Sequence, residues 1–132
     1  IKKLYNFSKN KRKIERKLKK YYPTLISINL LFNEDPLSKS KVFENALINQ
    51  LKADFFWRDP YKNEVDMILD EGKIIPVEVK YGEIKDIRGL LRFMDLFNIN
   101  KGFVISKEQE KKQIYKGKEI SIIPAWKWLL EK

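Results

Sequence analysis

The fold of this chain is decided by residues 64–80, which read EVDMILDEGKIIPVEVK. Val65, Met67 and Leu69 alternate with polar residues, which is the period of a half-buried strand. The following Gly72 predicts a tight turn, because glycine accepts the positive φ that other residues resist. In residues 74–79, apolar side chains then occupy both odd and even positions, as in a central strand that is covered on both faces. The stretch therefore predicts two neighbouring strands joined by a short loop.

Two charged residues, Glu78 and Lys80, lie inside this apolar run. Charged side chains are almost never buried without a partner, so their position needs a reason. They share one face of their strand, as Glu64 and Asp66 share one face of the preceding strand. A loop of two or four residues would send Asp66 and Glu78 to opposite faces. An odd loop, such as 70–72, would bring them to one face.

If the loop has an odd number of residues, one cluster is formed by Glu64, Asp66, Glu78 and Lys80. Carboxylates that close repel each other unless a cation lies between them, and oxygen ligands suit Mg²⁺ or Mn²⁺. The pattern Glu-x-Lys is itself unspecific, because lysine is abundant and the pattern recurs elsewhere in the chain. Its place inside an apolar strand, after a strand with an Asp, is what selects Glu78 and Lys80. The alternative is a cross-strand ion pair on a solvated face.

The pattern Asp66-x₁₁-Glu78-Val79-Lys80, with Val42-Phe43-Glu44-Asn45 in an expected helix upstream, resembles the PD-(D/E)XK nuclease superfamily. More narrowly, it resembles the nuclease-like C-terminal domain of archaeal and bacterial AAA-type ATPases. The similarity continues in order through Phe7-Ser8, Lys20-Tyr21-Tyr22, Glu64-Val65-Asp66 and Ile123-Pro124-Ala125-Trp126-Lys127-Trp128-Leu129-Leu130. The chain departs from that family after the tyrosine pair, where Pro23-Thr24 replaces an acidic residue.

This resemblance implies an α/β fold, with a restriction-endonuclease-like α-β-β-β-α-β core whose mixed central sheet is flanked by helices. It implies hydrolysis of DNA phosphodiesters with Mg²⁺ or Mn²⁺, and an ATPase module in the same or a partner chain. The implied catalytic residues are Glu44, Asp66, Glu78 and Lys80, of which the three acids would hold the metal. Read without the resemblance, Glu44 is a surface residue in the first turns of its helix, favoured by the helix dipole.

Apolar periodicity predicts the remaining elements. Helices are expected over 8–19, 37–52, 84–98 and 125–130, with Ser8 as a cap and Pro124 at the start of the last helix. Strands are expected over 3–7, 54–58, 102–105 and 120–123, and a short strand with a helical turn within 21–32. The polar residues 108–117 are expected to be partly helix or loop. This order predicts an α/β sandwich with a mixed sheet, in which the 102–105 strand follows a parallel crossover.

The net charge of +10 is concentrated near the start of the chain. Residues 1–22 hold ten Lys or Arg and one Glu, so this segment carries +9, and the rest of the chain carries +1. Such a segment is typical of a surface that binds phosphates, although a solvated linker or helix face has the same composition. The residues expected to contact nucleic acid are Lys9, Lys11, Arg12, Lys13, Arg16, Lys17, Lys85 and Arg88.

The chain has neither Cys nor His, so thiolate and imidazole chemistry are excluded. No apolar run approaches a membrane span or a signal peptide, which favours a cytoplasmic protein. Residues 1–22 are interpreted as a basic segment, a remnant of or linker from an upstream module, and 23–132 as the nuclease-like domain. DNA is the expected partner, and the oligomeric state stays open, with a homodimer as one option. Two functions remain: a Mg²⁺-dependent deoxyribonuclease, or an inactive nuclease fold that docks DNA or protein.

Overall fold

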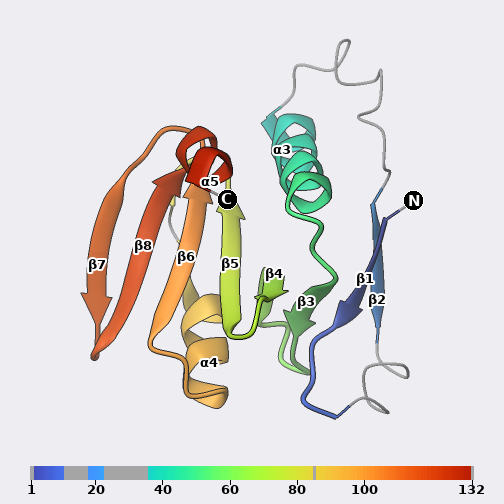
Figure 1. The fold of residues 1–132 in the computed structure, drawn as a ribbon, viewed down its shortest axis with the longest axis vertical. Helices are drawn as coiled ribbons and strands as arrows, with labels where there is room; N and C mark the ends of the chain where they lie inside the picture. The colour runs from blue at the N-terminus through green and yellow to red at the C-terminus, as the bar shows by residue number, and fades with distance from the viewer. Residues whose placement is uncertain (1, 11–17, 23–35, 85, 132) are drawn as a thin grey trace.

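A computed structural model describes residues 2–10, 18–22, 36–84 and 86–131. Within these ranges the chain forms an eight-stranded mixed sheet and three helices (Figure 1), which confirms the α/β class. The spatial order of the strands is β2-β1-β3-β4-β5-β6-β8-β7. The strands are β1 (Lys2–Asn6), β2 (Lys19–Tyr22), β3 (Phe55–Arg58), β4 (Glu64–Asp70), β5 (Ile74–Lys80), β6 (Lys101–Ser106), β7 (Lys111–Tyr115) and β8 (Lys118–Pro124). The helices are α3 (Pro36–Gln50), α4 (Arg88–Leu96) and α5 (Ala125–Glu131).

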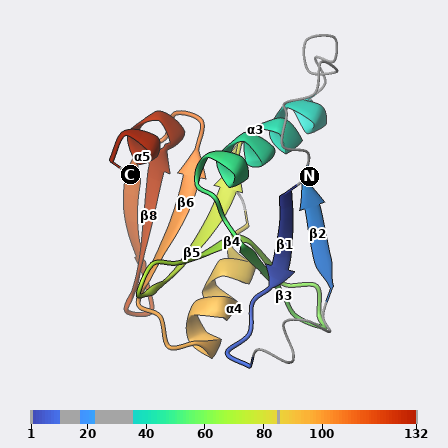
Figure 2. The same cartoon turned by 45° about the vertical axis from the view of Figure 1, so that its right-hand side comes forward.

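The helices cover the sheet from both sides (Figures 1 and 2). On one face, Leu47 and Ile48 of α3 and Trp128 of α5 join a buried cluster with the sheet. On the other face, a second cluster is built around Leu90, Phe93 and Met94 of α4. Five consecutive residues of β5 are buried between these layers, as expected of a central strand.

The β4–β5 hairpin has an odd loop. The strands pair antiparallel, with Met67 opposite Val77 and Asp70 opposite Ile74, so the loop is residues 71–73. Gly72 provides the positive φ, at 85°. The loop begins one residue later than the expected 70–72, but it has the same odd number of residues. Met67 and Val77 belong to the cluster under α3 and α5, so the residues that flank this pair, Asp66 and Glu78, share the opposite face.

A bulge lies beside Asp66. Phe55 pairs with Ile68 and Trp57 with Val65, so two steps along β3 correspond to three along β4. The extra residue falls within 66–67, at the position of the predicted site. Bulges of this kind redirect side chains and are frequent next to functional sites.

Residues 108–110 and 116–117 are loop and turn, as expected, but the region also contains a strand that was not predicted, β7, which pairs antiparallel with β8. β7 is an edge strand with most of its residues exposed, so it has polar side chains and lacks an apolar alternation. The helix expected over 84–98 is shorter, and Pro124 ends β8 instead of entering α5. The Ser8 hydroxyl accepts the backbone N–H of Asn10 at 3.2 Å, residues 9 and 10 are not helical, and Lys19 already begins β2. The rest of the 8–19 helix and the 23–32 expectation lie outside the described residues.

Both strands of the basic segment are part of the sheet. β1 runs parallel to β3 and pairs antiparallel with β2. Leu4 of β1 is fully buried, and Phe7 packs against Phe93 of α4. Residues 2–7 therefore contribute to the same core as the rest of the chain. No helix in the described ranges is long and apolar enough to cross a membrane.

Gly89 allows α4 to approach β4. A Cβ at this position would collide with the backbone oxygen of Glu64 and lie 2.9 Å from its nitrogen. We expect Gly89→Ala to lower the free energy of unfolding by about 3 kcal/mol, more than the ~1 kcal/mol gained in helix propensity. Gly102→Ala is the control, because its Cβ would meet the flexible Met94 side chain at 2.7 Å. Urea unfolding measures both variants, and equal losses would contradict this account.

Candidate functional site

The centre of the candidate site is the carboxyl pair of Asp66 and Glu78 on the β4–β5 hairpin. Glu78 is only 6 % exposed. Asp66 accepts a hydrogen bond from the backbone N–H of Val79, at 2.8 Å from its Oδ2. Lys80 places its Nζ 3.5 Å from Glu78 Oε2, on the same face of β5. Strand alternation thus brings two acids and one cation together, as the sequence predicted.

The electrostatics of this pair favour an added positive charge. Burial raises the pKa of Asp66, and the hydrogen bond from the Val79 N–H and the charges of Lys20 and Lys80 only partly oppose it. Burial also raises the pKa of Glu78 well above its ordinary value, and the charge of Asp66 raises it further. Each carboxyl makes ionisation of the other less favourable, because two negative charges at this separation repel. A cation between them would remove that penalty.

Glu44 approaches the pair from α3, on a separate element. Its carboxylate accepts a hydrogen bond from the Tyr22 hydroxyl at 2.7 Å. Burial, and then the charge of Asp66, raise the pKa of Glu44, so the two acids influence each other. Glu44 lines a neighbouring hollow of about 440 Å³, between β2 and α3, together with Tyr21 and Tyr22. Sequence reasoning assigned no role to Tyr22, and its only signal was its place in the Lys20-Tyr21-Tyr22 match.

Glu64 is engaged by two cations. It forms ion pairs with Lys20 of β2 and with Arg58 of β3, the latter at 3.5 Å. Its carboxylate therefore has positive partners, as Glu78 has in Lys80. Of this ion pair, Lys20 lines the hollow beside Glu44, and Glu64 lines a second pocket.

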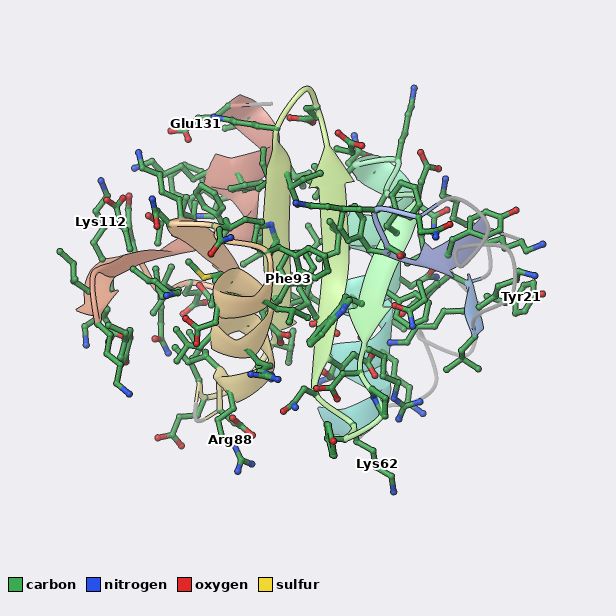
Figure 3. The ribbon with its side chains drawn as sticks, turned by 90° about the horizontal axis from the view of Figure 1, so that it is seen from below. Tyr21, Lys62, Arg88, Phe93, Lys112 and Glu131 are labelled. Carbon is green, nitrogen blue, oxygen red and sulfur yellow. The ribbon has the colours of Figure 1, made fainter. Side chains whose placement is uncertain are left out.

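The carboxyl pair opens into a polar pocket of about 470 Å³ between the hairpin and the start of α4. The lining combines the acids with three cations and the loop before β4: Tyr61, Lys62, Asn63, Glu64, Asp66, Glu78, Lys80, Asp86, Arg88 and Gly89. Figure 3 shows Lys62 and Arg88 extending from the same side of the molecule. Arg88 is held there by Asp86 in a two-bond ion pair, with both N···O distances at 3.0 Å. The pocket therefore presents cations around a buried acidic centre.

Two of the predicted nucleic-acid-binding residues can be placed. Arg88 lines the pocket, whereas Lys9 lies over Phe97, at the opposite end of α4, with its Nζ 5.9 Å from the ring centroid. Lys11, Arg12, Lys13, Arg16, Lys17 and Lys85 lie outside the described residues.

The donor set fits a hydrated hard cation with two protein carboxylates. Among the described residues, no group of three or more acidic side chains is placed to hold a metal ion. Mg²⁺ commonly keeps several waters and binds through one or two carboxylates, so Asp66 and Glu78 suffice. Glu44, bonded to Tyr22, would then act at a greater distance.

Comparison with protein families places this region in a known family. A family described as Domain of unknown function (DUF4143) matches residues 39–128, which span α3 to α5 and include all four predicted catalytic residues. No curated protein and no solved structure matches the chain.

Proposed function

Because the chain belongs to the DUF4143 family, a domain associated with the C-terminal regions of AAA-type ATPases, we propose that it is a Mg²⁺-dependent nuclease serving such an ATPase. The observation that carries this proposal is the pair of half-buried Asp66 and buried Glu78, with Lys80 beside it, in a pocket rimmed by cations. The order α3-β3-β4-β5-α4-β6 supports the finer proposal of a restriction-endonuclease-like core. DNA is the proposed substrate.

Each side chain of the pocket has a role in this proposal. Asp66 and Glu78 would hold the metal, which would lower the pKa of water and offset the charge of the phosphate. Lys80 orients the attacking water and stabilises the negative charge that develops on the phosphate oxygens. Lys62 and Arg88 contact the phosphates on either side of the cleaved bond.

The second candidate is an inactive module that docks DNA or a protein partner. The Glu44–Tyr22 hydrogen bond favours it, because that bond occupies an acid the nuclease reading assigns to the metal. An inactive module would retain binding while being indifferent to the charge of Asp66 and Glu78.

The deciding experiment is a cleavage assay on linear, circular and branched DNA, and on RNA, with Mg²⁺, Mn²⁺ or EDTA. We expect metal-dependent cleavage by the parent and none by Asp66→Asn or Glu78→Gln. Cleavage that persists in both variants would identify a contaminating nuclease. If the parent cleaves no substrate but binds DNA equally with and without metal, the docking module is the better account.

The basic segment is expected to supply sequence-independent affinity for the DNA backbone. Deleting it would remove Leu4 from the core, so the test is neutralisation: Lys9, Lys11, Lys13 and Lys17 to Gln together. We expect the log–log salt slope of duplex binding to fall by about 0.9 for each phosphate that is no longer neutralised. The control changes four exposed lysines elsewhere, Lys52, Lys73, Lys101 and Lys111, and so alters the net charge equally. Equal slopes in the two variants would show that only the total charge matters.

A further inference from the structure

The loop between β3 and β4 is held rigid by one aspartate. Asp59 Oδ1 accepts the backbone N–H of Tyr61 at 2.9 Å and that of Asn63 at 2.8 Å, and Oδ2 accepts the Asn63 side-chain amide at 2.7 Å. Two backbone bonds close the same loop, from Asp59 to Asn63 and from Lys62 to Asp59. Such a network fixes the loop before any ligand arrives, which lowers the entropy cost of binding.

The loop turns its two largest side chains outward. Tyr61 is 82 % exposed, and Lys62 is exposed with a φ of 67°. A lysine rarely adopts that backbone conformation, and such outliers concentrate at ligand-binding sites. Both residues line the pocket that contains Asp66 and Glu78, in which Tyr61 supplies the aromatic ring. An exposed ring and a cation therefore stand together at the rim of the acidic centre.

We propose that Tyr61 and Lys62 form a clamp for one unpaired nucleotide, with the base stacked on Tyr61 and its phosphate paired with Lys62. Stacking needs a free base face, and a duplex hides both faces of every internal base. The clamp therefore selects single-stranded or frayed nucleic acid. Only its position next to the cleaved phosphodiester rests on the proposed nuclease function, since the binding itself needs no cleavage.

The test measures binding without chemistry. Parent protein in EDTA is titrated with single-stranded and duplex oligonucleotides containing 2-aminopurine, whose fluorescence reports stacking, with DNA and RNA arms. We expect Tyr61→Ala to weaken single-strand binding roughly 5- to 150-fold and to abolish the fluorescence change, with duplex binding little altered. Tyr61→Trp should retain both signals. The matched control is Tyr115→Ala on β7, a tyrosine that does not line this pocket.

The contribution of Lys62 to binding is tested with a substitution that should leave the fold unchanged. Lys62→Gly removes the cation at a position where glycine is favoured, so the loop should keep its shape. The control is Lys116→Gly, another lysine at positive φ, in the β7–β8 turn. We expect the salt slope of single-strand binding to fall by about 0.7 in Lys62→Gly alone.

The outcomes separate this inference from the proposed function. If Tyr61→Ala binds single strands and changes the 2-aminopurine signal as the parent does, the clamp is overturned, whatever the cleavage assay shows. If Tyr61→Ala loses single-strand binding while the parent cleaves nothing with any metal, the clamp stands and the nuclease proposal fails.

Discussion

Replacing Lys80 by methionine is expected to reduce metal-dependent cleavage by at least about 100-fold, the scale of losing one preorganised charge at a transition state. Methionine keeps the aliphatic stem, so packing changes little. Binding of DNA should be nearly retained, because Lys62 and Arg88 still line the pocket. The folded state should be no less stable, since Glu78 can hold a proton once its cationic neighbour is absent.

The measurement pairs single-turnover cleavage rates with thermal melting for Lys80→Met and for a control, Lys73→Met. Lys73 is an exposed residue in the loop of the same hairpin, so its loss changes the net charge equally. Cleavage by Lys80→Met at the parental rate would remove Lys80 from the mechanism. A large drop in melting temperature would instead make the lost cleavage a folding defect.

Magnesium is expected to raise the melting temperature of the parent and to leave that of Asp66→Asn unchanged. At 100 times the dissociation constant, binding to the folded state stabilises it by about 2.7 kcal/mol, or roughly 10 °C for a domain of this size. The amide variant keeps the shape of the side chain but is a poorer ligand for a hard dication. Asp70→Asn is the control, because Asp70 is an exposed residue of the same strand. Equal shifts in all three proteins would show that Mg²⁺ binds elsewhere.

The same pair predicts a pH dependence in EDTA. The pKa of Glu78 is higher in the folded than in the unfolded protein, so the folded state binds the proton more tightly. The stability that Glu78 contributes is full below its ordinary pKa of 4.5 and declines above it, until the raised pKa of the folded state is passed. Glu78→Gln should lack this decline and be more stable than the parent at neutral pH. Parallel stability curves for parent and variant as the pH rises above 4.5 would contradict the raised pKa.

The elements that could be predicted are those whose pattern is local. Alternation over 64–69 and the two-faced apolar run over 74–79 state which side chains are buried, and both strands are present. The apolar positions over 37–52 likewise predicted α3. β7 was not predicted, because an exposed edge strand has no buried face and therefore no alternation of apolar and polar residues in its sequence.

Only the part of the site that follows from the alternation of side chains along the two strands was predicted. Asp66, Glu78 and Lys80 come together because the hairpin alternates, which the sequence determines once the loop is odd. The loop boundary at 71–73 and the bulge at 66–67 depend on how β4 pairs with both of its neighbours.

Contacts between distant segments were decided by the tertiary structure alone. Tyr22 reaches Glu44 across β2 and α3, Glu64 is engaged by Lys20 and Arg58, and the 59–63 loop carries Tyr61 to the rim of the pocket. The sequence by itself determined which faces of β4, β5 and α3 are apolar, the charge of each segment and the absence of thiol and imidazole groups. Which side chains meet was left to the folded chain, because periodicity records the face of each element but not the distance between elements.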